Sequence, residues 1–159
     1  MTTEQIGTES AERKLPTINL LKPLIVDKNR ILLVREDPVV PTSRNDPPKW
    51  LLPTIQIDGA EAFTAETLSQ IVQSRFGLKV GVRGAVKLEE GEVFGRKVNL
   101  IRTRRMIFMC KKESGRFLLD RKKYSEFSWV LLDQVDYLPL EDLTRETINA
   151  FLKKEVHDS

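Results

Sequence analysis

Residues 50–78 read WLLPTIQIDGAEAFTAETLSQIVQSRFGL and contain the signals of a strand followed by a helix. It returns from a proline-rich segment to apolar residues at 50–53, and residues 55–57 follow as a short strand. Apolar side chains then recur at helical spacing, at Leu68, Ile71, Val72 and Phe76. Thr64 suits an N-cap and Gly77 a C-cap. We therefore predict a strand followed by an amphipathic helix over residues 64–76.

The preceding residues predict a β-hairpin and a long loop. Residues 18–26 and 30–35 are apolar and rich in branched side chains, and the polar residues 27–29 separate them. Residues 37–48, DPVVPTSRNDPP, contain four prolines and show little periodicity. Loops of this length in compact domains are often functional.

The second half is predicted to be mainly strands, closed by a helix. Residues 80–88, 97–111 and 127–132 read as strands, with a turn expected at 113–116. Apolar residues share one helical face over 140–154, with acids in the first turn and lysines in the last. The order β-β-loop-β-α-β-β-β-α favours a mixed sheet with a helix on each face, an α/β/α sandwich.

Composition limits the class of protein. A chain of 159 residues with 40% hydrophobic residues predicts one globular domain. We expect a flexible leader at 1–17, the domain at 18–155 and a tail at 156–159. No apolar run approaches the ~20 residues of a membrane span, so we expect no membrane association and a cytoplasmic location. One Cys and one His leave too few ligands for disulfides, catalytic triads or zinc sites.

Charge is unevenly distributed along the chain. The window 96–123 contains eleven basic residues against two acidic ones, a net charge of +9, whereas the rest of the chain carries −6. Such a basic hairpin can meet a nucleotide, RNA or an acidic protein partner. The alternative is a solvated hairpin balanced by acids elsewhere in the fold.

These elements resemble the Nudix family in order and in residues. The shared landmarks are the hairpin ending in residues 30–35, the Trp-Leu-Leu-Pro at 50–53, the helix ending in Gly77-Leu78, the late strand at 126–130 and the terminal helix. The resemblance implies a Nudix-like α/β/α sandwich with a mixed sheet. It also implies cleavage of nucleoside diphosphates linked to another moiety, through glutamates of the signature GX5EX7REUXEEXGU that hold Mg²⁺ or Mn²⁺.

The chain departs from that signature at the metal ligands. Aligned from Pro53, the two glycines become Thr54 and Ile55, Glu61 survives, and REUXEE becomes residues 69–74, with amides at Gln70 and Gln73. Aligned from Gly77, the segment becomes residues 70–75 and places Arg75 at a ligand position. We favour the first register, in which amides keep the size of a carboxylate but not its charge. In the second, a guanidinium can contact phosphate directly.

Other residues are weaker candidates for a site. The surviving acids are Asp58, Glu61, Glu66, Glu89, Glu90 and Glu92. An active enzyme would use Glu61 with Glu89 or Glu90, although residues 89–92 also fit an exposed hairpin tip. Arginines interrupt an apolar face of the strand at 97–111, and Arg102, Arg104 and Arg105 are the leading candidates for phosphate or nucleic-acid contacts. Trp50 can stack on a base, although it also fits packing in the core. Arg35 and Lys49 flank the proline-rich loop and can form the rim of a pocket, or they can be ordinary surface residues.

Three functions follow from these patterns. The first is a degenerate Nudix domain, a pseudoenzyme that binds a nucleotide, RNA or a protein partner and needs no cofactor. The second is a hydrolase of nucleoside diphosphate derivatives with an atypical acid set and Mg²⁺ or Mn²⁺. The third is a structural module that docks on an acidic protein through window 96–123, or pairs as a homodimer.

Overall fold

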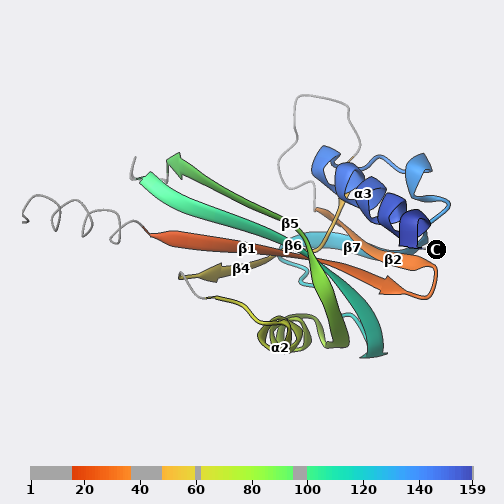
Figure 1. Cartoon of the computed structure of the whole chain (residues 1–159), viewed down its shortest axis with the longest axis horizontal. Helices are drawn as coiled ribbons and strands as arrows, with labels where there is room; N and C mark the ends of the chain where they lie inside the picture. Colours follow the sequence, from red (N-terminus) through yellow and green to blue (C-terminus); the bar gives the residue numbers. More distant parts are fainter. Residues whose placement is uncertain (1–15, 37–47, 60–61, 95–99, 159) are drawn as a thin grey trace, which may run out of the picture.

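The computed structural model describes residues 16–36, 48–59, 62–94 and 100–158, which form a mixed sheet between two helices (Figure 1). The strands are β1 (Thr17–Asp27), β2 (Arg30–Glu36), β3 (Trp50–Leu51), β4 (Ile55–Asp58), β5 (Leu78–Phe94), β6 (Leu100–Gly115) and β7 (Tyr124–Leu131). The helices are α2 (Ala65–Phe76), the short 3-10 helix η1 (Val135–Tyr137) and α3 (Asp142–Asp158). Among the described residues the sheet has seven strands, in the order β3-β2-β1-β6-β5, with β4 beside β1 and β7 beside β2.

The predicted N-terminal hairpin is confirmed. β1 and β2 are antiparallel, with Val26 opposite Ile31 and Asp27 opposite Arg30. The hairpin opens beyond these pairs, because β1 then pairs with β4 and β6 whereas β2 pairs with β3 and β7. This divergence leaves a gap between the two halves of the sheet.

Each helix covers one face of the sheet, as the predicted α/β/α sandwich requires. The buried side chains of α2, Leu68, Val72 and Phe76, pack with Leu21 and Phe108. On the other face Ile148 and Phe151 of α3 pack with Leu24 and Ile107. Figure 1 shows α2 and α3 on opposite sides of the strands.

Both predicted caps of α2 are present. The Thr64 hydroxyl accepts a hydrogen bond from the Thr67 backbone N–H at 3.1 Å, and the Thr67 hydroxyl accepts one from the Thr64 N–H at 2.8 Å. Gly77 ends the helix in the left-handed region, with φ of 72°, and its N–H donates to the Gln73 carbonyl. A Cβ at this position would lie 2.9 Å from the Arg116 carbonyl oxygen, so glycine is required.

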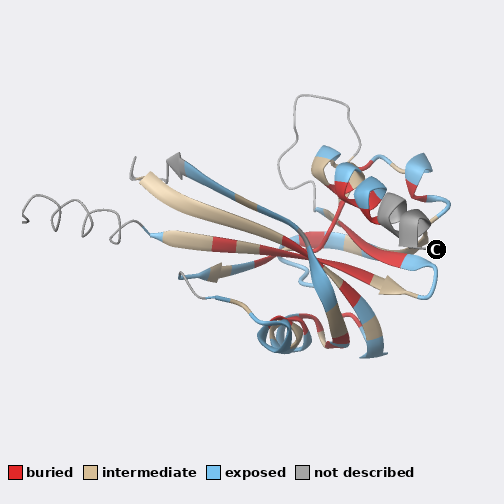
Figure 2. Ribbon diagram, in the orientation of Figure 1, coloured by how far each residue is buried: buried red, intermediate tan, exposed pale blue. Residues whose placement is uncertain are grey.

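The predictions for β5 and β6 need correction. The strand expected to end at residue 88 continues to Phe94, and the turn expected at 113–116 is wrong because β6 runs to Gly115. The turn-like acids and glycine of residues 89–92 stay extended because each pairs with β6 in an antiparallel ladder. This ribbon reaches beyond the core and is largely exposed or half-buried (Figure 2).

Two expectations concern residues that the structure does not describe. These are residues 37–47 of the predicted loop and 97–99 of the predicted strand. The other strands and the terminal helix agree to within a few residues, and the short helix η1 is an addition. No helix in the described part of the chain is long and apolar enough to cross a membrane.

Candidate functional site

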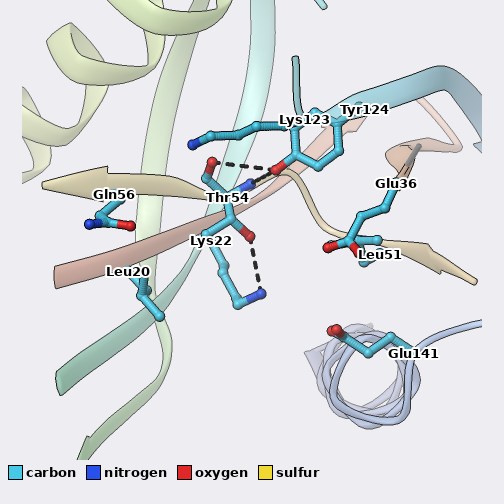
Figure 3. A pocket seen from close by; sticks show the side chains of 9 residues that line it. All are labelled: Leu20, Lys22, Glu36, Leu51, Thr54, Gln56, Lys123, Tyr124 and Glu141. Carbon is cyan, nitrogen blue, oxygen red and sulfur yellow. Dashed lines mark hydrogen bonds between the residues drawn. The ribbon is translucent and has the colours of Figure 1, made fainter. Parts of the chain in front are cut away.

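A cavity of about 360 Å³ opens at the gap between the two halves of the sheet (Figure 3). Its walls come from β1, β2, β3, β4, the start of β7 and the residue before α3. It is lined by Leu20, Lys22, Glu36, Leu51, Thr54, Gln56, Lys123, Tyr124 and Glu141. Polar side chains from distant parts of the sequence therefore converge here.

Lys22 is the unusual residue of this cavity. It interrupts the apolar run of β1, and it is only 7% exposed. Its ammonium donates a hydrogen bond of 3.1 Å to the Thr54 hydroxyl, and none of the described residues offers it an ion pair. Burial lowers the pKa of Lys22 below its ordinary value of 10.5; Glu141 and Glu36 oppose this shift. A desolvated ammonium with spare donors is suited to binding an anion.

Tyr124 fixes the backbone at Thr54. Its hydroxyl accepts a hydrogen bond from the Thr54 N–H at 3.1 Å and lies 3.5 Å from the Thr54 carbonyl, to which it donates. The phenol is 5% exposed, and burial raises its pKa above 10.0. Thr54 in turn donates from its hydroxyl to the Leu52 carbonyl at 3.3 Å. The hydroxyl that meets Lys22 is thus held in one place.

Two carboxylates face the same cavity. Glu36 ends β2, and Glu141 precedes α3, where its carboxylate accepts a hydrogen bond of 3.2 Å from the Thr144 hydroxyl. Figure 3 shows both on one side of Lys22, with Gln56 on the other. The cavity therefore combines a cation for anionic groups with carboxylate acceptors for hydroxyl or amino groups.

Solved structures of other proteins have a similar fold. A MutT protein from Methanosarcina mazei Go1 matches with a TM-score of 0.62 at 19% identity, over 89% of this chain and 97% of that one. The Nudix domain of NrtR from Shewanella oneidensis, solved with ADP ribose, matches with a TM-score of 0.60 at 12% identity, over 97% and 98%. The present chain has a Nudix-like fold.

A third solved structure has the same fold, whereas comparisons of sequence alone find no match. An ADP-ribose pyrophosphatase from Streptococcus suis matches with a TM-score of 0.55 at 16% identity, over 87% of this chain and 91% of that one. Neither a protein-family model nor a curated protein sequence matches the chain. The Nudix-like fold is therefore carried by the structure.

The helix that follows β4 in this Nudix-like fold offers no carboxylate set for a divalent metal. Its acid is Glu66, in the first turn. Gln70, Gln73 and Arg75 are exposed, and none of them lines the cavity around Lys22. Among the described residues there is no cluster of three His, Cys, Asp or Glu side chains suited to a metal ion. Glu61 lies outside the described residues.

Glu89 and Glu90 belong to β5 and pair across the sheet, so the hairpin tip expected at residues 89–92 is wrong. Glu89 lies 2.7 Å from the Lys87 ammonium and 3.3 Å from Arg105 Nη1, and Glu90 lies 3.5 Å from Arg104 Nε. The hydrogen bond from Lys87 lowers the pKa of Glu89. Asp58 ends β4 as an exposed residue, and Glu92 stands opposite Arg102.

The candidate arginines are divided between the faces of β6. Arg105 is in register with Leu20, which lines the cavity, and its charge also lowers the pKa of Lys22. Arg104 is in register with Asn19 and points to the opposite face, since neighbouring residues of a strand alternate. Of these arginines, Arg105 is the one on the cavity side, beside Glu89.

The structure brings Arg35 and Trp50 together, away from Lys22. The Arg35 guanidinium stacks 5.1 Å from the centre of the Trp50 ring and pairs with Glu126. Trp50 also lines a second cavity, of about 520 Å³, with Trp129 and Tyr137. Arg35 and Trp50 thus support each other next to a separate hollow.

Sequence reasoning missed Lys22, Thr54 as its partner, and Tyr124. Lys22 had a signal, since a lysine inside the apolar run INLLKPLIV has to be buried or to break the strand. Tyr124 had none, because its contact with Thr54 joins residues 70 positions apart.

Proposed function

We propose that the chain is a Nudix-like domain that binds a nucleoside diphosphate derivative in the cavity around Lys22 and does not hydrolyse it. The observation that carries this proposal is the buried ammonium of Lys22, held by one hydroxyl at the wall of an open cavity. A buried cation costs free energy unless it gains a partner. A diphosphate supplies that partner.

The rest of the cavity suits the other parts of such a ligand. Glu36 and Glu141 can accept hydrogen bonds from ribose hydroxyls or from an amino group of the base. The volume of about 360 Å³ is in the range of small-molecule sites. ADP ribose in the structurally similar NrtR domain supports this ligand class.

The absence of hydrolysis rests on the donors available. In the register that starts from Pro53, Thr54, Gln70 and Gln73 stand at positions of the Nudix signature, which we take to be degenerate. Glu89 and Glu90, which an atypical enzyme would use, are engaged by Arg105 and Arg104. A carboxylate paired to arginine is a poorer metal ligand, because the metal must displace the guanidinium.

The test is an assay of the full chain against a panel of nucleoside diphosphate derivatives with Mg²⁺ or Mn²⁺. We expect binding of at least one compound and no turnover. Cleavage that is lost in Glu61→Gln would show a working hydrolase with an atypical acid set. Failure to bind any compound would leave the structural module as the explanation.

A further inference from the structure

The basic window 96–123 separates into two parts with different electrostatic roles. In the strand part, Arg104 and Arg105 pair with acids of β5, and Lys112 lies 3.4 Å from an Asp27 carboxylate oxygen. Three of the five cations of β6 are thus paired within the fold. The segment that follows β6 adds four further cations, Arg116, Arg121, Lys122 and Lys123, against one acid, Asp120.

That segment ends in a turn, Arg121-Lys122-Lys123, which we name the basic turn. The three side chains are exposed, and they make no hydrogen bond or ion pair within the described part of the chain. Asp120 organises the turn, since its carboxylate accepts from the Lys122 N–H at 3.0 Å and its carbonyl from the Lys123 and Tyr124 N–H groups. The Asp120 carboxylate therefore binds the backbone of the turn, and the three cationic side chains are exposed to solvent.

The basic turn continues directly into the cavity wall. Lys123 lines the cavity, and the next residue, Tyr124, holds Thr54, the partner of Lys22. Figure 3 shows the Lys123 side chain beside the ring of Tyr124. Successive Cα atoms lie about 3.8 Å apart, so the exposed cations Arg121 and Lys122 lie next to this part of the cavity wall.

We propose that the ligand is the phosphorylated terminal nucleotide of a single-stranded nucleic acid, whose following phosphates run over the basic turn. This deepens the proposed function and rests on it. A free nucleotide has its charge inside the cavity and leaves Arg121 and Lys122 without partners. A chain with a phosphate at each nucleotide meets both requirements, and its binding releases counterions from the strand.

The test compares ADP-ribose, ADP and a short phosphorylated oligoadenylate by fluorescence anisotropy and competition, using the full chain. We expect the oligoadenylate to bind more tightly than ADP and to be displaced by saturating ADP. In Arg121→Gln/Lys122→Gln, ADP affinity stays the same, while oligoadenylate affinity falls and its salt dependence, the slope of log K against log salt, decreases by about 1.4. The matched control is Lys79→Gln/Arg83→Gln, two exposed cations of β5, which should change neither.

Each other outcome is informative. If ADP-ribose and ADP bind and the oligoadenylate binds no better, this inference fails and the proposed function stands. If none of the three binds, and no other compound of the nucleoside diphosphate panel binds, the proposed function fails as well. Oligoadenylate binding that survives both excess ADP and Lys22→Met would place the nucleic acid outside the cavity and overturn the inference. Equal displacement by polyglutamate would assign the basic turn to acidic proteins instead.

Discussion

Lys22 and Thr54 are joined by a hydrogen bond of 3.1 Å between a buried ammonium and a hydroxyl, directly after the β1–β4 pairing ends at Leu21 and Ile55. The ammonium has two further protons that no described residue accepts. A buried charge with only one hydrogen-bond partner lowers the stability of the ligand-free protein. It also provides binding energy for an anion that enters the cavity.

Replacing Lys22 should therefore separate stability from binding. We expect Lys22→Met to raise the free energy of unfolding by about 1 kcal/mol, because a buried charge is exchanged for an apolar side chain of similar length. ADP-ribose affinity should fall by at least about tenfold, since a hydrogen bond to a charged group contributes ~1.5–3 kcal/mol. Urea unfolding and calorimetry measure the two effects. A variant that is less stable yet binds normally would show a structural lysine.

The lowered pKa of Lys22 predicts a pH dependence of both quantities. As pH rises through the folded-state pKa toward 10.5, the folded chain loses this proton before the unfolded chain does, so the free energy of unfolding increases. Anion affinity should fall over the same pH range, because the ammonium that attracts the anion loses its charge there. Lys22→Met should show neither trend, and Lys28→Met, in the exposed β1–β2 turn, should retain both. Identical curves for wild type and Lys22→Met would refute the assignment.

Tyr124→Phe tests the support of Thr54. The change keeps the buried ring but leaves the Thr54 N–H without its acceptor, which should cost about 1–3 kcal/mol of unfolding free energy. Because burial raises the pKa of Tyr124, wild-type stability should also fall above pH 10.0, where the unfolded chain ionises first. The variant should lack this decrease. The comparison uses urea unfolding at neutral and alkaline pH, and an unchanged midpoint at neutral pH would contradict the role given to the hydroxyl.

Glu89 should titrate below its ordinary carboxylate range. The hydrogen bond from Lys87 lowers its pKa, and Arg105 acts in the same direction. The stability that this pairing gives is present at neutral pH and is lost as pH falls through the lowered pKa. NMR titration of the Glu89 side chain measures the shift, and Lys87→Met should move the pKa upward. A normal pKa in the wild type would instead leave Glu89 available as a metal ligand.

The sequence predicted elements well where the signal is local. The caps Thr64 and Gly77 act within one helical turn of the residues they contact, so the helix between them was correctly placed. The turn predicted at residues 89–92 was wrong. Acids and glycine favour turns locally, but cross-strand pairing of Glu89 and Glu90 with Arg105 and Arg104 keeps these residues extended. Tertiary pairing overrides such preferences.

The candidate site was predictable only in part. The +9 window pointed to a basic surface, but which of its cations lack acid partners depends on the register between β5 and β6. The cavity joins Lys22, Thr54 and Glu141, and no short motif brings these positions together. Their convergence follows from the split of β1 from β2.

The most direct test of the account is calorimetric titration of ADP-ribose into the full chain in the presence of a chelator, followed by the same titration into Lys22→Met and Lys28→Met. We expect saturable binding by wild type and Lys28→Met without divalent metal, strong weakening in Lys22→Met, and intact ADP-ribose recovered afterwards. Binding that requires Mg²⁺, or that is equal in all three proteins, would contradict a metal-independent site built around Lys22.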